Sequence, residues 1–146
     1  NCDLLVVMTD LTRDMNILGN VVKLHSSQKV LHNQRIGKIE IKKHNVVDDY
    51  LLEVMNTHFS KENIKKNATG TTVRHTSPTN IYKGVVPLPR ESEQKMIFEK
   101  INSFRKIVSE EELLYYKCQR LKQALMSDLL TGNVRVKYEE EKEEVA

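Results

Sequence analysis

The sequence predicts an α+β fold, in which a small mixed α/β domain is followed by one long helix of the coiled-coil-forming type. Short apolar segments separated by turn residues fill the first 90 residues. The stretch from Arg90 to Thr131 then contains neither glycine nor proline. Its apolar residues recur at alternating steps of three and four, which is the spacing of a narrow helical seam. The predicted domains are 1–90 for the folded domain, 91–132 for the long helix, and 133–146 for a short strand with an acidic tail.

The folded domain is predicted to begin with three strands. Leu4–Met8 is a short apolar run typical of a buried strand, and Val21–Leu24 is a second such run. The residues between them, Thr9–Asn16, are polar and turn-like. Val30–Ile41 is predicted as a third strand region, because apolar and charged side chains alternate over its second half.

Helices follow these strands. Val46–His58 carries apolar residues at helical spacing and is predicted to be a helix. Ser60 is the predicted N-cap of a shorter helix that runs through Lys66. Ser77-Pro78 has the residue types of an N-cap and first position of one helical turn. Two further short strands are predicted at Thr72–His75 and Val85–Leu88.

The long helix has a clear predicted start and end. Pro87 and Pro89 lack an N–H and favour an extended segment, and Glu91 and Glu93 place negative charge where a helix begins. Gly132 is a suitable C-terminal stop, because glycine adopts the left-handed conformation without steric cost. The result is one helix of roughly 40 residues, which is about 60 Å long.

The apolar stripe of this helix predicts what it contacts. The stripe has two runs, separated by Ser109–Glu112, and their registers differ. The predicted interface residues are Ile97, Ile101, Phe104, Val108, Leu114, Cys118, Leu121, Leu125 and Leu129. A change of register locally over- or underwinds a supercoil, or marks a bend. We expect a partner helix from another chain or another copy to cover the stripe; packing along the helix's own domain is the alternative.

Residues capable of catalysis are present, but they form no recognisable catalytic or metal-binding motif. The five histidines are scattered, and the sequence has no glycine-rich phosphate loop and no closely paired cysteines. Asp10 and Asp48-Asp49 are possible paired carboxylates, but nothing in the sequence converges on them. We therefore expect a non-catalytic protein without a cofactor or a metal ion.

The chain carries no apolar run long enough to span a membrane and no signal peptide. Its two isolated cysteines, Cys2 and Cys118, favour a reducing cytoplasm. A strand that begins at the third residue suggests a fragment of a larger protein. The segment 137–146 has two lysines against five glutamates, a net charge of −3, so the remainder of this chain of net charge +3 carries +6. This tail is predicted to be a solvated terminus, with a regulatory role as the alternative.

Several segments resemble the specificity subunit of type I restriction–modification systems. They are Ala68–His75, Val85–Pro89 with Glu93-Gln94 ahead of a long helix, and Leu129–Val136. Val30–Arg35 resembles a strand near the middle of that family's target-recognition domain. The resemblance covers nearly the whole chain to Val136. One difference is Arg90-Glu91, where the family usually has another proline and an apolar residue.

The resemblance implies which task each part of the specificity subunit and each partner protein performs. In that family two target-recognition domains each read half of a split DNA site, and two long antiparallel helices set the spacing and bind the modification subunits. The chain would then be the later part of one target-recognition domain plus one long helix. The implied partners are double-stranded DNA, the modification (methyltransferase) subunits, the restriction subunit in the full complex, and a partner helix from a second copy or a second conserved region.

Positive charge ahead of the long helix is clustered in the sequence, as expected for contact with phosphate. Together with a glycine-containing turn it gives the candidate DNA-binding residues, namely Arg35, Lys38, Lys42, Lys43, Gly70, Thr71, Thr72, Arg74 and His75. An ordinary solvated surface, with Gly70–Thr72 as a structural turn, is the alternative. Two other functions also remain open: a structural oligomerisation module that reads no DNA, and the recognition domain of a fused enzyme whose catalysis lies elsewhere.

Overall fold

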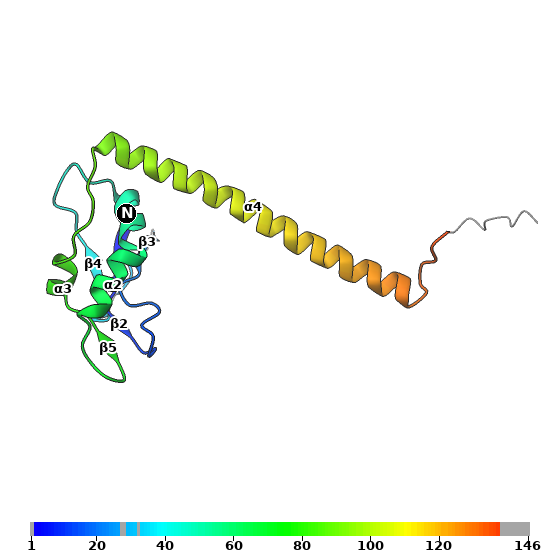
Figure 1. Ribbon diagram of the computed structural model, residues 1–146, viewed down its shortest axis with the longest axis horizontal. Coiled ribbons are helices and arrows are strands. Elements are labelled where there is room, and N and C mark those ends of the chain that lie inside the picture. The colour runs from blue at the N-terminus through cyan, green and yellow to red at the C-terminus, as the bar shows by residue number, and fades with distance from the viewer. Residues whose placement is uncertain (1, 27–28, 32, 138–146) are drawn as a thin grey trace, which may run out of the picture. The chain divides into compact units, whose positions relative to one another are not determined.

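The computed structural model describes residues 2–26, 29–31 and 33–137 (Figure 1). It confirms the predicted α+β class with one long helix. The strands of the described residues are β1 (Cys2–Val7), β2 (Thr9–Asp10), β3 (Val21–His25), β4 (Ile36–Ile39) and β5 (Arg74–His75). The helices are α1 (Asp48–Met55), α2 (His58–Lys66), α3 (Pro78–Tyr82) and α4 (Glu91–Leu130).

The core of the folded part lies against a small antiparallel sheet. Its strand order is β3-β1-β4, and β2 pairs separately with β5. Leu4 and Val6 alternate with more exposed neighbours on β1, so both point to the same face and are buried there with Val21 of β3. Side chains of α1 pack against this cluster, among them Leu51 and Met55.

The predicted strand Val30–Ile41 is wrong over its first half. The strand covers only Ile36–Ile39, and Val30 and Leu31 are 60% and 100% exposed. Asn33 explains where the strand starts: its side-chain oxygen accepts a hydrogen bond from the Arg35 N–H at 2.9 Å, and its carbonyl accepts one from the Ile36 N–H at 3.1 Å. This local turn uses backbone groups that a longer ladder would need. His32 lies outside the described residues.

The predicted strand Val85–Leu88 is also wrong, because this segment is irregular. Pro87 and Pro89 have no N–H to donate to a ladder. The carbonyl of Pro87 instead accepts a hydrogen bond from the Tyr50 hydroxyl at 2.9 Å. Burial, and then the nearby Glu93 carboxylate, raise the pKa of Tyr50 above its ordinary value of 10.0, so the hydroxyl remains a donor.

The helix predictions are confirmed in position, with one cap corrected. The prediction that Ser60 caps α2 is wrong, because Thr57 is the N-cap and its hydroxyl accepts the Ser60 N–H at 3.4 Å. Ser60 is buried within the first turn of the helix and donates to the Val54 carbonyl at 2.8 Å. Ser77 caps α3 as predicted, since its hydroxyl accepts the Asn80 N–H at 3.3 Å.

The long helix α4 is one continuous element of 40 residues. Beyond its end Gly132 has φ +76°, the left-handed conformation expected of a glycine stop. Residues 133–137 form no strand, and the acidic residues 138–146 lie outside the described part of the chain.

Gln94 fixes the start of α4. Its side chain is fully buried, and its oxygen accepts a hydrogen bond from the Val47 N–H at 2.8 Å. Its amide nitrogen donates to the carbonyls of Asn45, at 2.9 Å, and Pro89, at 2.8 Å. The first turns of the helix are thereby tied to the segment that leads into α1.

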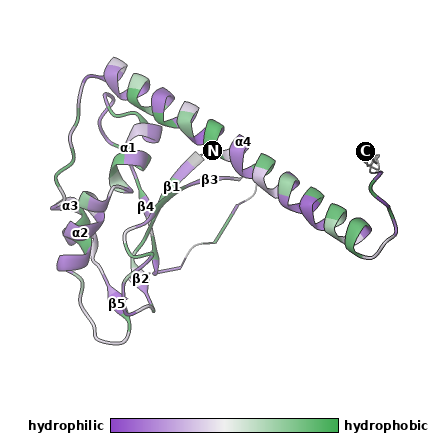
Figure 2. Ribbon diagram, turned by 45° about the vertical axis from the view of Figure 1, so that its right-hand side comes forward, coloured by the Kyte–Doolittle hydropathy of each residue, from purple (hydrophilic) through white to green (hydrophobic). Residues whose placement is uncertain are grey.

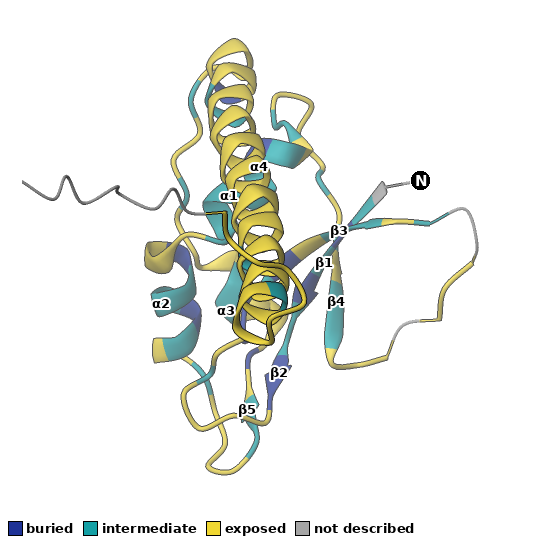
Figure 3. Cartoon of the chain, turned by 90° about the vertical axis from the view of Figure 1, so that its right-hand side faces the viewer, coloured by how far each residue is buried: buried dark blue, intermediate teal, exposed yellow. Residues whose placement is uncertain are grey.

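The chain divides into two compact units, Asn1–Ile101 (unit 1) and Asn102–Ala146 (unit 2), with the boundary inside α4. The described part of α4 in unit 2 is exposed along its length, apart from two half-buried side chains, Gln119 and Asp128 (Figure 3). The sequence-based boundaries at residues 90 and 132 stay a prediction.

Candidate nucleic-acid interface

One end of unit 1 is built by the pairing of β2 with β5. Thr9 lies opposite His75 and Asp10 opposite Arg74. The segment Thr69–His75, which ends with β5, is closed by two backbone hydrogen bonds: the Thr69 N–H donates to the His75 carbonyl at 2.9 Å, and the His75 N–H donates to the Thr69 carbonyl at 2.8 Å. We call this segment the closed loop; its residues Thr69–Thr72 are exposed.

Gly70 and Arg74 hold the closed loop in shape. Gly70 has φ +96°, and a Cβ at this position would lie 2.0 Å from the Val73 carbonyl oxygen. No other residue type fits this conformation without a change of the loop. Arg74 is half-buried, and its Nη1 donates to the Gly70 carbonyl at 2.6 Å. His75 lies beside Thr9, with 2.9 Å between Nδ1 and the threonine hydroxyl.

The sheet register brings one further predicted residue to this end. Met8 donates its N–H to the Arg35 carbonyl at 2.8 Å and accepts the Thr76 N–H at 2.9 Å, so Arg35 lies across Met8 from the end of β5. The Arg35 side chain is exposed. The structure therefore brings together Arg35, the closed loop and His75.

The three predicted lysines lie elsewhere, Lys38 within β4 and Lys42 and Lys43 after it. Lys38 is opposite Leu5 of β1, and its Nζ is 3.1 Å from a carboxylate oxygen of Asp3. Lys42 and Lys43 are exposed and follow the far end of β4, because this strand runs from Ile36 near the β2 end towards Ile39. The nine candidate DNA-binding residues therefore do not form one cluster: the three lysines lie on or after β4, away from the end built by β2 and β5.

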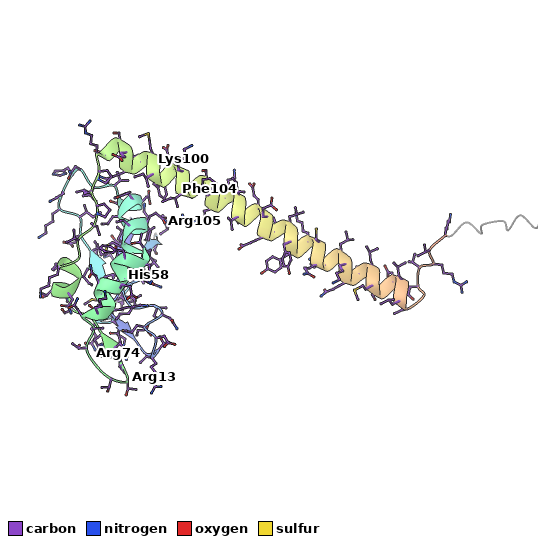
Figure 4. All side chains as sticks on the ribbon, viewed as in Figure 1. Arg13, His58, Arg74, Lys100, Phe104 and Arg105 are labelled. Carbon is purple, nitrogen blue, oxygen red and sulfur yellow. The ribbon has the colours of Figure 1, made fainter. Side chains whose placement is uncertain are left out.

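Sequence reasoning missed Arg13, which is exposed in the loop after β2. Figure 4 shows Arg13 and Arg74 at the same end of unit 1, so this end carries one more exposed cationic side chain than the sequence indicated. The sequence does contain an indication of this loop. Thr12 follows Asp10 by two residues, a spacing typical of an Asx turn.

Asp10 organises the loop that carries Arg13. Only 1% of Asp10 is exposed. One carboxylate oxygen accepts the N–H and hydroxyl of Thr12, both at 2.7 Å, and the other accepts the N–H groups of Ile17, at 2.7 Å, and Leu18, at 3.0 Å. Burial raises the pKa of Asp10, but these hydrogen bonds outweigh burial and hold the pKa below its ordinary value of 3.8.

We expect Asp10→Asn to lower the free energy of unfolding by about 2–3 kcal/mol at pH 7, because an amide group would meet N–H donors that need an acceptor. A depressed pKa in the folded state stabilises the fold above the unfolded-state pKa, and this contribution disappears as the pH falls through the folded-state pKa. The difference between wild type and variant should therefore shrink below about pH 4 in urea unfolding curves. Asp14→Asn, an exposed carboxylate in the same loop, is the control. An equal difference at pH 3 and pH 7 would contradict this account.

The predicted helix interface is uncovered in the described residues of unit 2, whereas Ile97 in unit 1 is half-buried. Hydrophobic residues recur along α4, where the ribbon changes repeatedly between green and purple (Figure 2). In unit 1, Ile97 and Ile101 line a hollow of about 420 Å³ with Tyr50 and Val54 of α1. The other predicted interface residues belong to unit 2, and all of them are exposed, from Leu129 at 42% to Phe104 at 66%. Cys118 is a free, exposed thiol within the second apolar run.

The chain is similar in sequence to two type I restriction enzyme specificity subunits. It is 25% identical over 125 residues to the MjaVIII specificity subunit of Methanocaldococcus jannaschii, a match that covers 83% of this chain and 29% of that protein. It is 28% identical over 112 residues to the EcoBI specificity subunit of Escherichia coli, covering 74% of this chain and 23% of that protein. The resemblance seen in the sequence is thereby confirmed.

The chain spans less than a third of the length of either relative. No family model matches it, and no solved structure matches it. Among the described residues no group of three or more histidine, cysteine, aspartate and glutamate side chains could hold a metal ion. None of the described helices combines the length and the apolar character needed to cross a membrane.

Proposed function

We propose that the chain is a DNA-recognition part of a type I specificity subunit, which is not itself catalytic and positions methyltransferase subunits on a split DNA site. The similarity to two specificity subunits carries this proposal. The partners are double-stranded DNA, the modification subunits, and the restriction subunit in the full complex. The sparse cysteines favour a cytoplasmic location.

The two units suit different tasks in such a complex. Unit 1 offers DNA an end with exposed Arg13, exposed Arg35 and the exposed residues Thr69–Thr72 of the closed loop. In unit 2 the exposed stripe of α4 suits a partner helix, from a second copy or from a second conserved region of a longer chain. Pairing would let the length of α4 set the distance between two recognition domains.

The second candidate is a structural oligomerisation module that reads no DNA. The exposed stripe of α4 favours it, since this stripe needs a partner in either case. DNA binding separates the two candidates.

We expect the full chain to bind duplex DNA with an affinity that falls steeply as salt rises. Each phosphate neutralised by a cationic side chain contributes about 0.9 to the slope of log K against log salt. Arg35→Ala should lower this slope by about that amount, whereas Lys122→Ala on α4 should leave it unchanged. Fluorescence anisotropy of a labelled duplex between 50 and roughly 200 mM salt measures both. Absence of binding, or an Arg35→Ala slope equal to that of wild type, would count against the DNA-recognition function.

A further inference from the structure

The closed loop presents a run of unused hydrogen-bond donors. Within the described part of the chain, the backbone N–H groups of four consecutive residues, Gly70–Val73, donate to no protein acceptor. The side-chain hydroxyls of Thr71 and Thr72 likewise have no partner among the described residues. Gly70, Thr71 and Thr72, which supply three of these N–H groups and both hydroxyls, are exposed, and Val73 is half-buried. Consecutive N–H groups in a tight turn that includes a left-handed residue commonly bind an anion.

The shape of the closed loop is fixed before any ligand binds. Its ends are joined by the two hydrogen bonds between Thr69 and His75, and Gly70 supplies the positive φ that any side chain would disturb. Arg74 spans the loop from inside, because its Nη1 donates to the Gly70 carbonyl and its Nε is buried. A donor array that is already ordered loses little conformational entropy on binding.

Cationic side chains lie in the helix that precedes the closed loop and at the same end of unit 1. Lys65 and Lys66 lie in the last turn of α2, a few residues ahead of the loop. Arg13 lies at the same end of unit 1 as Arg74 (Figure 4). Arg74 itself is half-buried and engaged with the loop, so it is poorly placed to extend towards a ligand.

We infer that the closed loop holds a backbone phosphate of DNA with uncharged donors, the N–H groups of Gly70–Val73 and the hydroxyls of Thr71 and Thr72. Arg74 is a positioning residue that keeps the loop in shape and does not contact the phosphate. This inference rests on the proposed DNA-recognition function. Threonine hydroxyls and backbone N–H groups often bind DNA phosphates and fix the register of a protein on the duplex.

Uncharged donors leave a distinct signature in binding. Counterion release follows the number of phosphates that cationic side chains neutralise, so neutral donors add affinity without adding to the salt slope. Phosphate contacts also carry no sequence information directly. The contribution of the closed loop to affinity is therefore the same for every DNA sequence. It is also the same at every salt concentration, in contrast to that of Arg35.

The test compares variants of the full chain by anisotropy with a duplex of random sequence, at several salt concentrations. Thr71→Val combined with Thr72→Val should weaken binding roughly tenfold at each salt concentration with an unchanged slope. Gly70→Ala, whose new Cβ meets the Val73 carbonyl, and Arg74→Ala should give the same result by opening the loop. Thr79→Val, an exposed threonine of α3, is the matched control and should bind as wild type.

The outcomes separate the inference from the function on which it rests. If Arg74→Ala lowers the salt slope as much as Arg35→Ala does, Arg74 contacts phosphate and the positioning role is overturned. If the double threonine variant binds as wild type, the closed loop is not the phosphate site. If wild type binds no DNA, the proposed function fails before any variant is compared. As a second readout, amide resonances of Gly70–Val73 should shift when duplex is added to wild type and to Arg35→Ala, but not to Gly70→Ala.

Discussion

Leu121→Glu combined with Leu125→Glu is expected to abolish self-association through α4. Both leucines are exposed, at 60% and 50%, so their stabilising contribution arises only in an assembled state. Burying a leucine contributes about 1.5–3 kcal/mol, and four leucines are lost in each dimer. We therefore expect the association constant to fall by more than about a thousandfold. Sedimentation velocity at tens of micromolar should show an assembled wild type and a monomeric variant.

The control for this experiment adds the same charge to the other face of α4. Gln123→Glu with Ser127→Glu changes two exposed residues that lie opposite the leucines at 3.6 residues per turn. This variant should remain assembled. A wild type that is already monomeric would refute the assignment of the stripe as an interface between copies, and the stripe would then need another partner.

The second large effect is expected at Gln94. Gln94→Ala removes all three of its hydrogen bonds and leaves the Val47 N–H and the carbonyls of Asn45 and Pro89 without their partner. Unsatisfied groups of this kind cost about 1–3 kcal/mol each when they stay buried, so we expect a loss of about 3 kcal/mol in the free energy of unfolding. Urea unfolding followed by circular dichroism measures it.

Ser92→Ala is the matched control, because Ser92 is exposed in the same first turn of α4. It should change stability by less than about 0.5 kcal/mol. A similarly small change for Gln94→Ala would mean that water replaces the lost partners and that the start of α4 depends on other contacts.

The sequence predicted α4 well because its signals are local. Pro89 and the two early glutamates together mark its start and Gly132 marks its end, and the structure places the ends at Glu91 and Leu130. The predicted strand at Val30 failed for the converse reason. Apolar residues there suggested a strand, but the Asn33 turn decided where pairing with β1 could begin.

The candidate interface was only partly predictable. Arg35 and His75 are 40 positions apart in the sequence. The backbone of Met8 is hydrogen-bonded both to Arg35 and to Thr76, the residue after His75, and no local sequence pattern specifies this strand register. Asp10 looked like a candidate for carboxylate chemistry, whereas its oxygens are used by N–H groups up to eight residues away. The Glu93-Gln94 pair supported the family resemblance, but that Gln94 binds three backbone groups was visible only in the structure.

The contacts of Gln94 indicate how the folded domain of this chain could be joined to the long helix of another protein. All three partners of its side chain are main-chain atoms, at Asn45, Val47 and Pro89. Every residue type except proline offers the same N–H and carbonyl groups, so substitutions at these positions leave the joint intact as long as the backbone keeps its course. The hydrogen bonds that tie the start of α4 to the rest of unit 1 therefore do not depend on which side chains stand at positions 45 and 47. A chimaera could join the residues ahead of α4 to the long helix of another protein. If that helix has a glutamine at its fourth position, the same three hydrogen bonds would form.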